Sequence, residues 1–127
     1  DLFAGTGALG LEALSRGASR CDFVENGASA LHALKANVAK LRVRDRTRIF
    51  RRDALAFVSH PGAEMYDIAF ADPPYGSTQL DRLVEGWLAR PYSRILTVEH
   101  ASDHELPGRS RRQRYSETTV STYSRRR

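Results

Sequence analysis

Cysteine is nearly absent from this sequence, which contains one, Cys21, among 127 residues. A single thiol excludes an internal disulfide and any cysteine-cluster metal site, and it fits a reducing, cytoplasmic environment. The four histidines are scattered, without a partner at metal-ligand spacing. His100 and His104 are four residues apart, but the preceding strand pattern and the Pro107-Gly108 pair favour a loop with a surface role over ligation. We therefore expect no bound metal.

Long apolar runs are also missing. None approaches the length that spans a membrane, and neither a signal peptide nor a transit segment is recognisable. The length and the apolar fraction of 41% are ordinary for one globular domain with one core. Because the chain opens inside a motif, we interpret 1–127 as a single, N-terminally incomplete domain whose first strand and upstream segment precede Asp1. We expect a cytoplasmic monomer without membrane contact.

Lysine is scarce although the chain is basic. Only Lys35 and Lys40 accompany the arginines among 20 basic residues, and the net charge is +5 with a pI near 9.9. Arginine binds phosphates bidentately and stacks on bases, so a polyanionic partner is one interpretation, and codon bias with a solvated surface is the other. Four arginines form a cluster near the end of the chain (Arg109, Arg111, Arg112 and Arg114). We hypothesise that this cluster contacts phosphates, and a solvated loop is the alternative.

What the sequence does contain is a glycine-rich opening. Gly5, Gly7 and Gly10 follow the order G-x-G-x-x-G, and a helical pattern begins at once. Gly5 and Gly7 can take positive φ and carry no Cβ, so a ligand can lie against the backbone and face the N–H groups of the helix start. The spacing alone is a weak signal. Glu25 strengthens it, because a carboxylate twenty residues after Gly5 can accept hydrogen bonds from ribose hydroxyls.

Periodicity predicts an alternation of strands and helices. The expected helices cover residues 8–16, 28–41, 54–58 and 79–88, and the expected strands cover 21–25, 47–52, 66–71, 94–99 and a terminal hairpin of 113–115 and 118–123. Such alternation favours a mostly parallel α/β sheet with right-handed crossovers. Ligands of these sheets gather at the carboxyl ends of the strands. Gly5, Gly7, Glu25, Asp53 and Asp72 all follow strands, so we expect them to converge on one rim.

A stiff acidic turn, Asp72-Pro73-Pro74-Tyr75, follows the strand predicted at 66–71. The two prolines lack backbone donors and leave carbonyls free to accept. A carboxylate followed by a free carbonyl can take both hydrogens of an exocyclic amine, and Tyr75 offers a face for base stacking worth on the order of 1–3 kcal/mol. The alternative is a rigid loop in which Tyr75 covers the core. The position of the turn in a glycine-loop α/β sheet favours amine binding.

Together these motifs resemble one enzyme superfamily. The opening D-L-F-A-G-T-G-A-L-G-L-E-A-L-S-R-G, followed by F-V-E-N, R-D-A and A-D-P-P-Y, is similar to class I S-adenosylmethionine-dependent methyltransferases. It resembles more closely the RsmD family, bacterial enzymes that methylate the N2 amine of a guanine in small-subunit ribosomal RNA. The resemblance covers nearly the whole chain. It implies a Rossmann-like, three-layer α/β/α fold with a seven-stranded sheet, S-adenosylmethionine as cofactor, and ribosomal RNA or the small ribosomal subunit as partner.

The resemblance also implies roles for individual residues. Asp1 would hold the methionine ammonium, Glu25 would bind the ribose hydroxyls, and Asp53 would accept from the adenine amine. Asn26 follows Glu25 where the family often has another acidic residue, so we expect a different contact to the ribose and adenine edge. The remaining cofactor contacts would come from the glycine loop and the backbone beside Asp53 (Phe3, Ala4, Gly5, Thr6, Gly7 and Ala54).

The implied catalytic residues are those of the acidic turn. Asp72 and the carbonyl of Pro73 would grip the target amine, Pro74 would stiffen the turn, and Tyr75 would stack on the guanine. Methylation at a pyrimidine carbon usually needs a cysteine nucleophile, and Cys21 begins a strand far from Asp72, which argues against that chemistry.

Other functions remain open from the sequence. Acidic-Pro-Pro-aromatic turns serve several amines, so adenine N6 in DNA or RNA and a protein glutamine are alternative substrates. A dinucleotide-binding redox domain would share the glycines and Glu25, but it gives no reason for the turn at Asp72. A catalytically silent RNA-binding module is a further alternative, against which the intact Asp72 and Tyr75 weigh.

Overall fold

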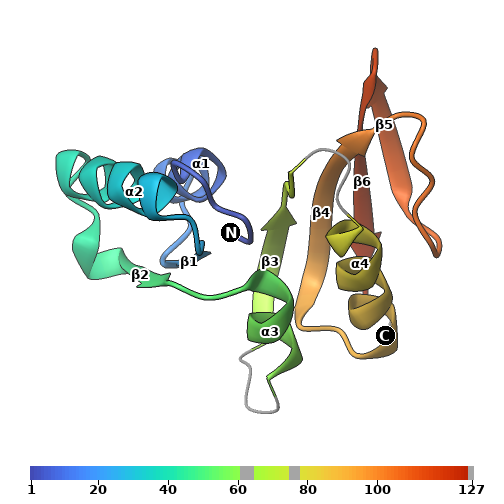
Figure 1. Cartoon of the computed structure of the whole chain (residues 1–127), viewed down its shortest axis with the longest axis horizontal. Helices are drawn as coiled ribbons and strands as arrows, with labels where there is room; N and C mark the ends of the chain where they lie inside the picture. Colours follow the sequence, from blue (N-terminus) through green and yellow to red (C-terminus); the bar gives the residue numbers. More distant parts are fainter. Residues whose placement is uncertain (61–64, 75–77, 126–127) are drawn as a thin grey trace. The chain divides into compact units, whose positions relative to one another are not determined.

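The computed structural model describes residues 1–60, 65–74 and 78–125. Contacts group the chain into two compact units, Asp1–Phe57 and Val58–Arg127, and each unit is described by itself. Figure 1 follows the chain through its helices and strands. That 1–127 is a single domain remains a prediction. Within the described ranges, no helix has the length and apolar character needed to cross a membrane.

The first unit combines two parallel strands with two helices. The α1 helix (Ala8–Ser15) follows the glycine loop, and strand β1 (Cys21–Val24) leads to α2 (Ala28–Lys40). A short 3-10 helix, η1 (Arg44–Arg46), then enters β2 (Thr47–Phe50), which lies parallel to β1.

Two contacts fix the ends of this small sheet. Leu2 forms a parallel bridge with Val24, so the residues before the glycine loop run alongside the end of β1. Arg48 donates two hydrogen bonds to the buried carboxylate of Asp22, at 2.9 and 2.7 Å, and thereby joins β2 to β1. A charged, bidentate pair of this kind is stronger and more directional than a neutral hydrogen bond.

The core of the first unit follows from the apolar face of α2. Leu31, Leu34 and Val38 recur at helical spacing and are buried, and Leu34 and Val38 pack in one cluster with Phe23 and Ala4. The helix therefore covers β1 and the start of the glycine loop.

Two of the three glycines are required by this packing. A Cβ on Gly7 would lie 2.4 Å from Leu34 Cδ1, and a Cβ on Gly10 would lie 2.4 Å from Phe23 Cε1 and 2.6 Å from Cys21 Sγ. Gly7 also has a φ of 88°, in the left-handed region that favours glycine. The G-x-G-x-x-G spacing thus serves close contact between α1, β1 and α2.

We expect Gly10→Ala to lower the free energy of unfolding by about 1–3 kcal/mol, because the added methyl overpacks the contact with Phe23 and Cys21. Gly86→Ala is the matched control, since Gly86 lies inside a helix with open space around its Cβ position. This second change should raise stability by about 0.5–1 kcal/mol. Urea denaturation of both variants measures the difference, and equal effects would contradict the packing argument.

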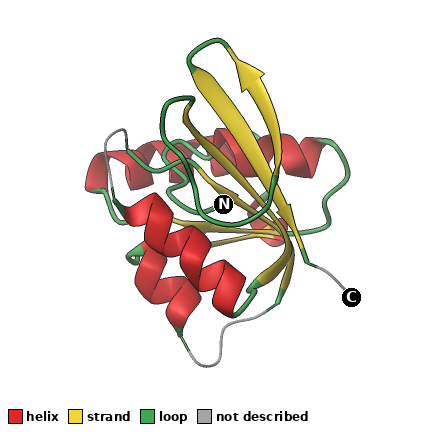
Figure 2. Cartoon of the chain, turned by 90° about the vertical axis from the view of Figure 1, so that its right-hand side faces the viewer, coloured by secondary structure: helices red, strands yellow, loops and turns green. Residues whose placement is uncertain are grey.

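The second unit contains a mixed four-stranded sheet. Strand β3 (Tyr66–Ala71) is parallel to β4 (Ser93–Ala101), β4 is antiparallel to β6 (Thr118–Ser124), and β6 is antiparallel to β5 (Arg111–Tyr115). The strand order is β3-β4-β6-β5, which places β5 at an edge. Figure 2 shows β5 and β6 as a twisted hairpin with its turn at the top of the view. The predicted α/β fold with parallel strands and an antiparallel terminal hairpin is confirmed, and the sheet of this unit is mixed.

Helix α4 (Gln79–Ala89) covers this sheet, whereas the short helix α3 (Ala54–Ser59) lies at the division between the units. The buried face of α4 repeats at helical spacing (Leu80, Leu83, Val84 and Trp87). Trp87 Nε1 donates to the backbone oxygen and the hydroxyl of Ser93, each at 3.0 Å, and its ring lies 5.9 Å from that of Tyr123. The helix is thus attached to the beginning of β4 and the end of β6 (Figure 1).

Strand β4 is longer than the sequence suggests. It continues to Ala101, so the prediction that His100 lies in a loop is wrong. His100 pairs with Thr119 across the ladder, and its Nε2 lies 2.7 Å from Ser121 Oγ. The extension is stabilised by pairing with β6, a long-range contact that local periodicity does not report.

Candidate functional site

Glu25 follows β1 and holds the glycine loop in place. Its Oε1 accepts a hydrogen bond from Gly5 N at 2.8 Å, and its Oε2 accepts from Gly27 N at 2.8 Å and from Asn26 N at 3.1 Å. An ionised carboxylate offers roughly four lone-pair positions. Three are occupied by backbone donors, so the half-buried carboxylate can accept one further donor, such as a ribose hydroxyl.

The loop itself has an unusual backbone. Phe3, Gly5 and Gly7 have φ values of 56°, 58° and 88°, and for the non-glycine Phe3 this conformation costs about 1–2 kcal/mol. Apart from Gly5 and its two chain neighbours, no atom of the described residues lies within 4 Å of the position that a Cβ on Gly5 would take, so the backbone there is bare. Strain of this kind gathers at sites that bind ligands. Gly5 therefore faces open space, whereas Gly7 faces the core.

Asp1 and Thr6 close the two ends of the loop. The Oδ2 atom of Asp1 accepts from the backbone N of Gly10, in the first turns of α1, at 3.0 Å. The backbone oxygen of Thr6 accepts from Asn37 Nδ2 at 3.0 Å, which ties the loop to α2. Ala4, between them, is buried and donates its N–H to Val24 O at 3.0 Å.

Asp53 and Ala54 lie at the start of α3. Asp53 Oδ2 accepts from Ala56 N at 3.0 Å, so its exposed carboxylate caps the first turn of this helix, and Ala54 is buried. One carboxylate oxygen of Asp53 therefore has a structural role. Contact with adenine stays a prediction for both residues.

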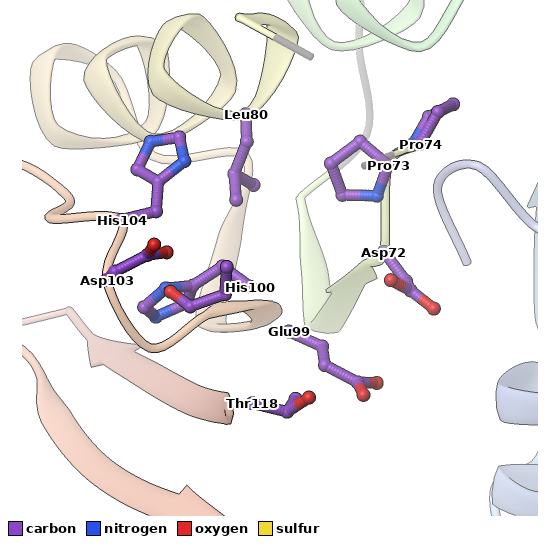
Figure 3. Close-up of a pocket in the computed structure, with 10 residues that line it drawn as sticks. Asp72, Pro73, Pro74, Leu80, Glu99, His100, Asp103, His104 and Thr118 are labelled. Atoms are coloured by element: carbon purple, nitrogen blue, oxygen red, sulfur yellow. The ribbon is translucent and has the colours of Figure 1, made fainter. Parts of the chain in front are cut away.

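A cavity of about 210 Å³ opens in the second unit at the carboxyl ends of β3 and β4. The turn after β3 contributes Asp72, Pro73 and Pro74, and β4 contributes Glu99 and His100 (Figure 3). The rest of its wall comes from α4, the segment after β4 and the first residue of β6 (Leu80, Ala101, Asp103, His104 and Thr118). Tyr75 lies outside the described residues.

The acidic and histidine side chains of this cavity differ in their surroundings. His104 Nε2 lies 2.8 Å from Asp81 Oδ1, on α4. In contrast, the carboxylates of Asp72 and Glu99 make no hydrogen bond or ion pair within residues 1–60, 65–74 and 78–125. Partial burial raises the pKa of the Asp72 carboxyl above its ordinary value, because the charged form loses solvation. These two carboxylates remain available to donors of a ligand.

The structure brings the predicted residues together in two groups. Asp1, Glu25, Asn26 and the loop of residues 3–7 form one group in the first unit, joined by hydrogen bonds. Asp72, Pro73 and Pro74 form another at the rim of the cavity in the second unit. Convergence of the two groups on one rim stays a prediction. Within the described part of the chain, no group of three or more metal-ligating side chains occurs.

Glu99 was missed by reasoning from the sequence. It follows the buried residue Val98, and Val98 is paired with Ala71, so Glu99 occupies on β4 the place that Asp72 occupies after β3. Ligands bind at the carboxyl ends of parallel strands. The strand expected at 94–99 ends at Glu99, so the same rule that selects Glu25, Asp53 and Asp72 also selects Glu99.

Comparison with known proteins identifies the family. Residues 1–124 match the model of the family described as Conserved hypothetical protein 95. The chain belongs to this family. This is the RsmD family that the sequence predicts. The chain is 32% identical to YlbH of Bacillus subtilis strain 168 over 138 aligned positions. The alignment covers 99% of this chain and 74% of YlbH. The chain is 34% identical over 112 positions to "Ribosomal RNA small subunit methyltransferase D" of Escherichia coli K12, covering 84% of this chain and 54% of that enzyme.

Solved structures agree with the RsmD fold. A hypothetical protein of Thermus thermophilus has a TM-score of 0.86 and 30% identity, and the match covers 98% of this chain and 72% of that one. TrmK of M. capricolum, in complex with S-adenosylhomocysteine, has a TM-score of 0.70 at 9% identity, with 98% and 60% covered. The predicted methyltransferase fold is confirmed, and the S-adenosylhomocysteine bound to TrmK is the product form of the cofactor that the sequence predicts for this chain.

Proposed function

We propose that this chain forms the catalytic part of an S-adenosylmethionine-dependent methyltransferase that acts on ribosomal RNA. The target we propose is the exocyclic N2 amine of a guanine in the small subunit. One observation carries the proposal: in a chain of the RsmD family, the Asp72 carboxylate and the Pro73 carbonyl stand at the carboxyl end of β3, at the rim of a 210 Å³ cavity. The name of the Escherichia coli relative supports ribosomal RNA as the substrate.

The first unit fits the cofactor. Gly5 leaves backbone bare for close approach, the Glu25 carboxylate has one acceptor position for a ribose hydroxyl, and Asp1 retains an oxygen for an ammonium group. When bound, S-adenosylmethionine supplies an electrophilic methyl group on a sulfonium centre. Glu25 and Asp1 would bind and orient its polar ends, and Phe3, Ala4, Thr6 and Gly7 would shape the loop around it. Asn26, Asp53 and Ala54 would line the adenosine.

The second unit would prepare the nucleophile. Guanine N2 is a weak nucleophile because its lone pair is delocalised into the ring. Asp72 and the Pro73 carbonyl would each accept one N–H of the amine, which favours a pyramidal nitrogen and directs its lone pair outward. The nitrogen held by Asp72 and Pro73 would accept the methyl group that the cofactor supplies, leaving a neutral thioether, and would then lose a proton. Positioning and electrostatics supply most of the rate, and the target base must leave its stack.

The test of this function is methyl transfer with labelled S-adenosylmethionine to small ribosomal subunits, naked small-subunit RNA and DNA, followed by mass spectrometry of the modified nucleoside. We expect N2-methylguanosine from the ribosomal substrate. If the label is found on adenine N6 or on a protein glutamine, that amine is the target and guanine N2 is not. Stabilisation of the protein by NAD but not by S-adenosylhomocysteine would instead support a redox domain and overturn the proposal.

The arginines of β5 and Arg109, which precedes this strand, are proposed contacts to RNA phosphates. Every residue of β5 is exposed, and the side chains of Arg112 and Arg114 bond to nearby protein oxygens. The side chains of Arg109 and Arg111 make no hydrogen bond or ion pair in the part of the chain that the structure describes. Their guanidinium groups remain available to bind phosphate bidentately.

We expect the double change Arg109→Ala and Arg111→Ala to weaken RNA binding and to reduce the slope of log K against log salt by about 1.4 to 1.8, the loss of two phosphate contacts. The control pair is Arg90→Ala and Arg94→Ala, exposed residues near the opposite, amino end of β4. Filter binding at several salt concentrations measures the slopes. An unchanged slope in the first pair would exclude Arg109 and Arg111 from the RNA interface.

A further inference from the structure

The inference concerns Glu99, which lies beside Asp72 at the ends of two parallel strands. Ala71 on β3 is paired with Val98 on β4, so the next residue on each strand is acidic. Neighbouring strands are about 4.8 Å apart, and residues in register point to the same face. Figure 3 shows the two carboxylates extending toward the same side of the view, away from His104. Both residues line the cavity.

The side chain of Glu99 does not hold the fold together through polar contacts with the described residues. Its side chain is exposed and forms no hydrogen bond or ion pair with any residue that the structure describes. Its partner across the antiparallel ladder is Val120, which offers no side-chain donor. Glu25, in contrast, accepts from three backbone N–H groups. The carboxylate of Glu99 is therefore a free acceptor at the cavity that Asp72 also lines.

The chemistry of the proposed target gives this acceptor a use. Guanine presents a donor at N1–H directly beside its N2 amine, whereas adenine presents a lone pair at N1 beside its N6 amine. An ionised carboxylate only accepts hydrogen bonds. We propose that Glu99 is a specificity-determining residue that accepts the N1–H of the target guanine while Asp72 and Pro73 hold the N2 amine. This inference rests on the proposed function.

Two carboxylates and the Pro73 carbonyl then accept hydrogen bonds from three donors on one edge of the base. A base that lacks the N1 hydrogen would place its own lone pair against the Glu99 carboxylate, and that acceptor would be left without a donor. A site built to receive a donor discriminates strongly against an analogue that lacks it, because the acceptor that the base covers stays unpaired. Glu99 therefore favours guanine over adenine and over purines without a hydrogen at N1.

The experiment compares guanine with 2-aminopurine at the target position of a synthetic RNA. 2-Aminopurine keeps the amine at position 2 but has a lone pair at N1. We expect Glu99→Gln to lower kcat/KM for guanine by roughly 10- to 100-fold. For 2-aminopurine the loss should be less than about 3-fold, or the rate should rise, because the glutamine amide can donate to N1. Both bases meet the same enzyme, so the missing O6 of 2-aminopurine cancels from the change in preference.

Glu105→Gln is the matched control, since it removes the same charge from an exposed residue that does not line the cavity. It should leave the preference for guanine unchanged. Glu99→Ala supplies no new donor. It should reduce the preference for guanine over 2-aminopurine only by lowering kcat/KM for guanine. Thermal melting with S-adenosylhomocysteine verifies that each variant is folded and binds the cofactor product.

The outcomes separate the inference from the proposed function. If the wild-type protein methylates guanine N2 but Glu99→Gln slows guanine and 2-aminopurine equally, or changes neither rate, Glu99 does not read N1 and the inference is overturned. If the wild-type protein produces no N2-methylguanosine from ribosomal RNA, the proposed function itself fails. A preference that shifts toward 2-aminopurine only in the Glu99 variants supports both.

Discussion

Asp72→Asn should lower kcat for methylation of small-subunit RNA roughly 10²- to 10³-fold, the usual loss when one preorganised electrostatic contact to the reacting group is removed. Asparagine keeps the size of the side chain but replaces one acceptor oxygen with a donor, which faces an N–H of the target amine. The affinity for S-adenosylhomocysteine should stay close to wild type, because the proposed cofactor contacts lie in residues 1–57. Single-turnover kinetics and calorimetry measure the two quantities.

The control for this change is Asp67→Asn, because Asp67 is an exposed aspartate on β3, the strand that Asp72 follows, and lies outside the cavity. It removes the same charge and should leave kcat within about 2-fold, as expected for a surface change away from the chemistry. A fully active Asp72→Asn enzyme would be incompatible with amine binding by this carboxylate. Equal losses in both variants would assign the effect to charge and not to position.

The same carboxylate predicts a dependence on pH. Partial burial raises the pKa of Asp72, and only the ionised form accepts hydrogen bonds with both oxygens. As pH falls through this raised pKa, the carboxylate gains a proton and kcat should decline. The decline should therefore begin at a higher pH than for an ordinary, solvated aspartate.

Glu25→Ala should weaken S-adenosylhomocysteine binding by roughly 10- to 100-fold. A hydrogen bond from a hydroxyl to a charged group contributes about 1.5–3 kcal/mol, and the alanine variant loses that contact. The backbone N–H groups of Gly5, Asn26 and Gly27 also lose their acceptor, so the loop is less well held before the ligand arrives. Isothermal titration calorimetry with S-adenosylhomocysteine measures the change.

Glu12→Ala is the control, because Glu12 is an exposed glutamate on α1 whose ion pair is with Arg16 on the same helix. An exposed pair of this kind contributes little, so the affinity should be unchanged. Glu25→Gln should lie between wild type and Glu25→Ala, since the amide oxygen can still accept on one side. Wild-type affinity in Glu25→Ala would remove this residue from the cofactor site.

Much of the fold followed from local patterns. The stripe of Leu31, Leu34 and Val38 predicted α2 because an amphipathic helix must bury one face, and the structure buries all three. The spacing from Gly5 and the position at the end of a strand predict that Glu25 lies on the same rim as the glycine loop, and Glu25 accepts a hydrogen bond from Gly5 N. The helix stripe depends on residues that are close in the sequence, and the position of Glu25 depends on the end of one strand.

What was missed depends on contacts between distant segments. Arg111 and Arg112 begin β5 although a run of charge is atypical of strands, because β5 pairs with β6 along one side and leaves these side chains in solvent. Gly10 was interpreted through the nucleotide-binding spacing, whereas its nearest neighbours are Phe23 and Cys21 on β1. Neither pairing partners nor the close approach of a helix to a strand can be read from a short window of residues.

The position of β5 at the edge of its sheet has a consequence for self-association. An edge strand exposes unpaired N–H and C=O groups that can pair with another copy of the chain. Here that edge carries Arg111, Arg112 and Arg114, and an antiparallel copy would bring like charges face to face. The positive charge that we assign to phosphate binding thus also opposes edge-to-edge aggregation, and RNA that neutralises it would cover the same strand.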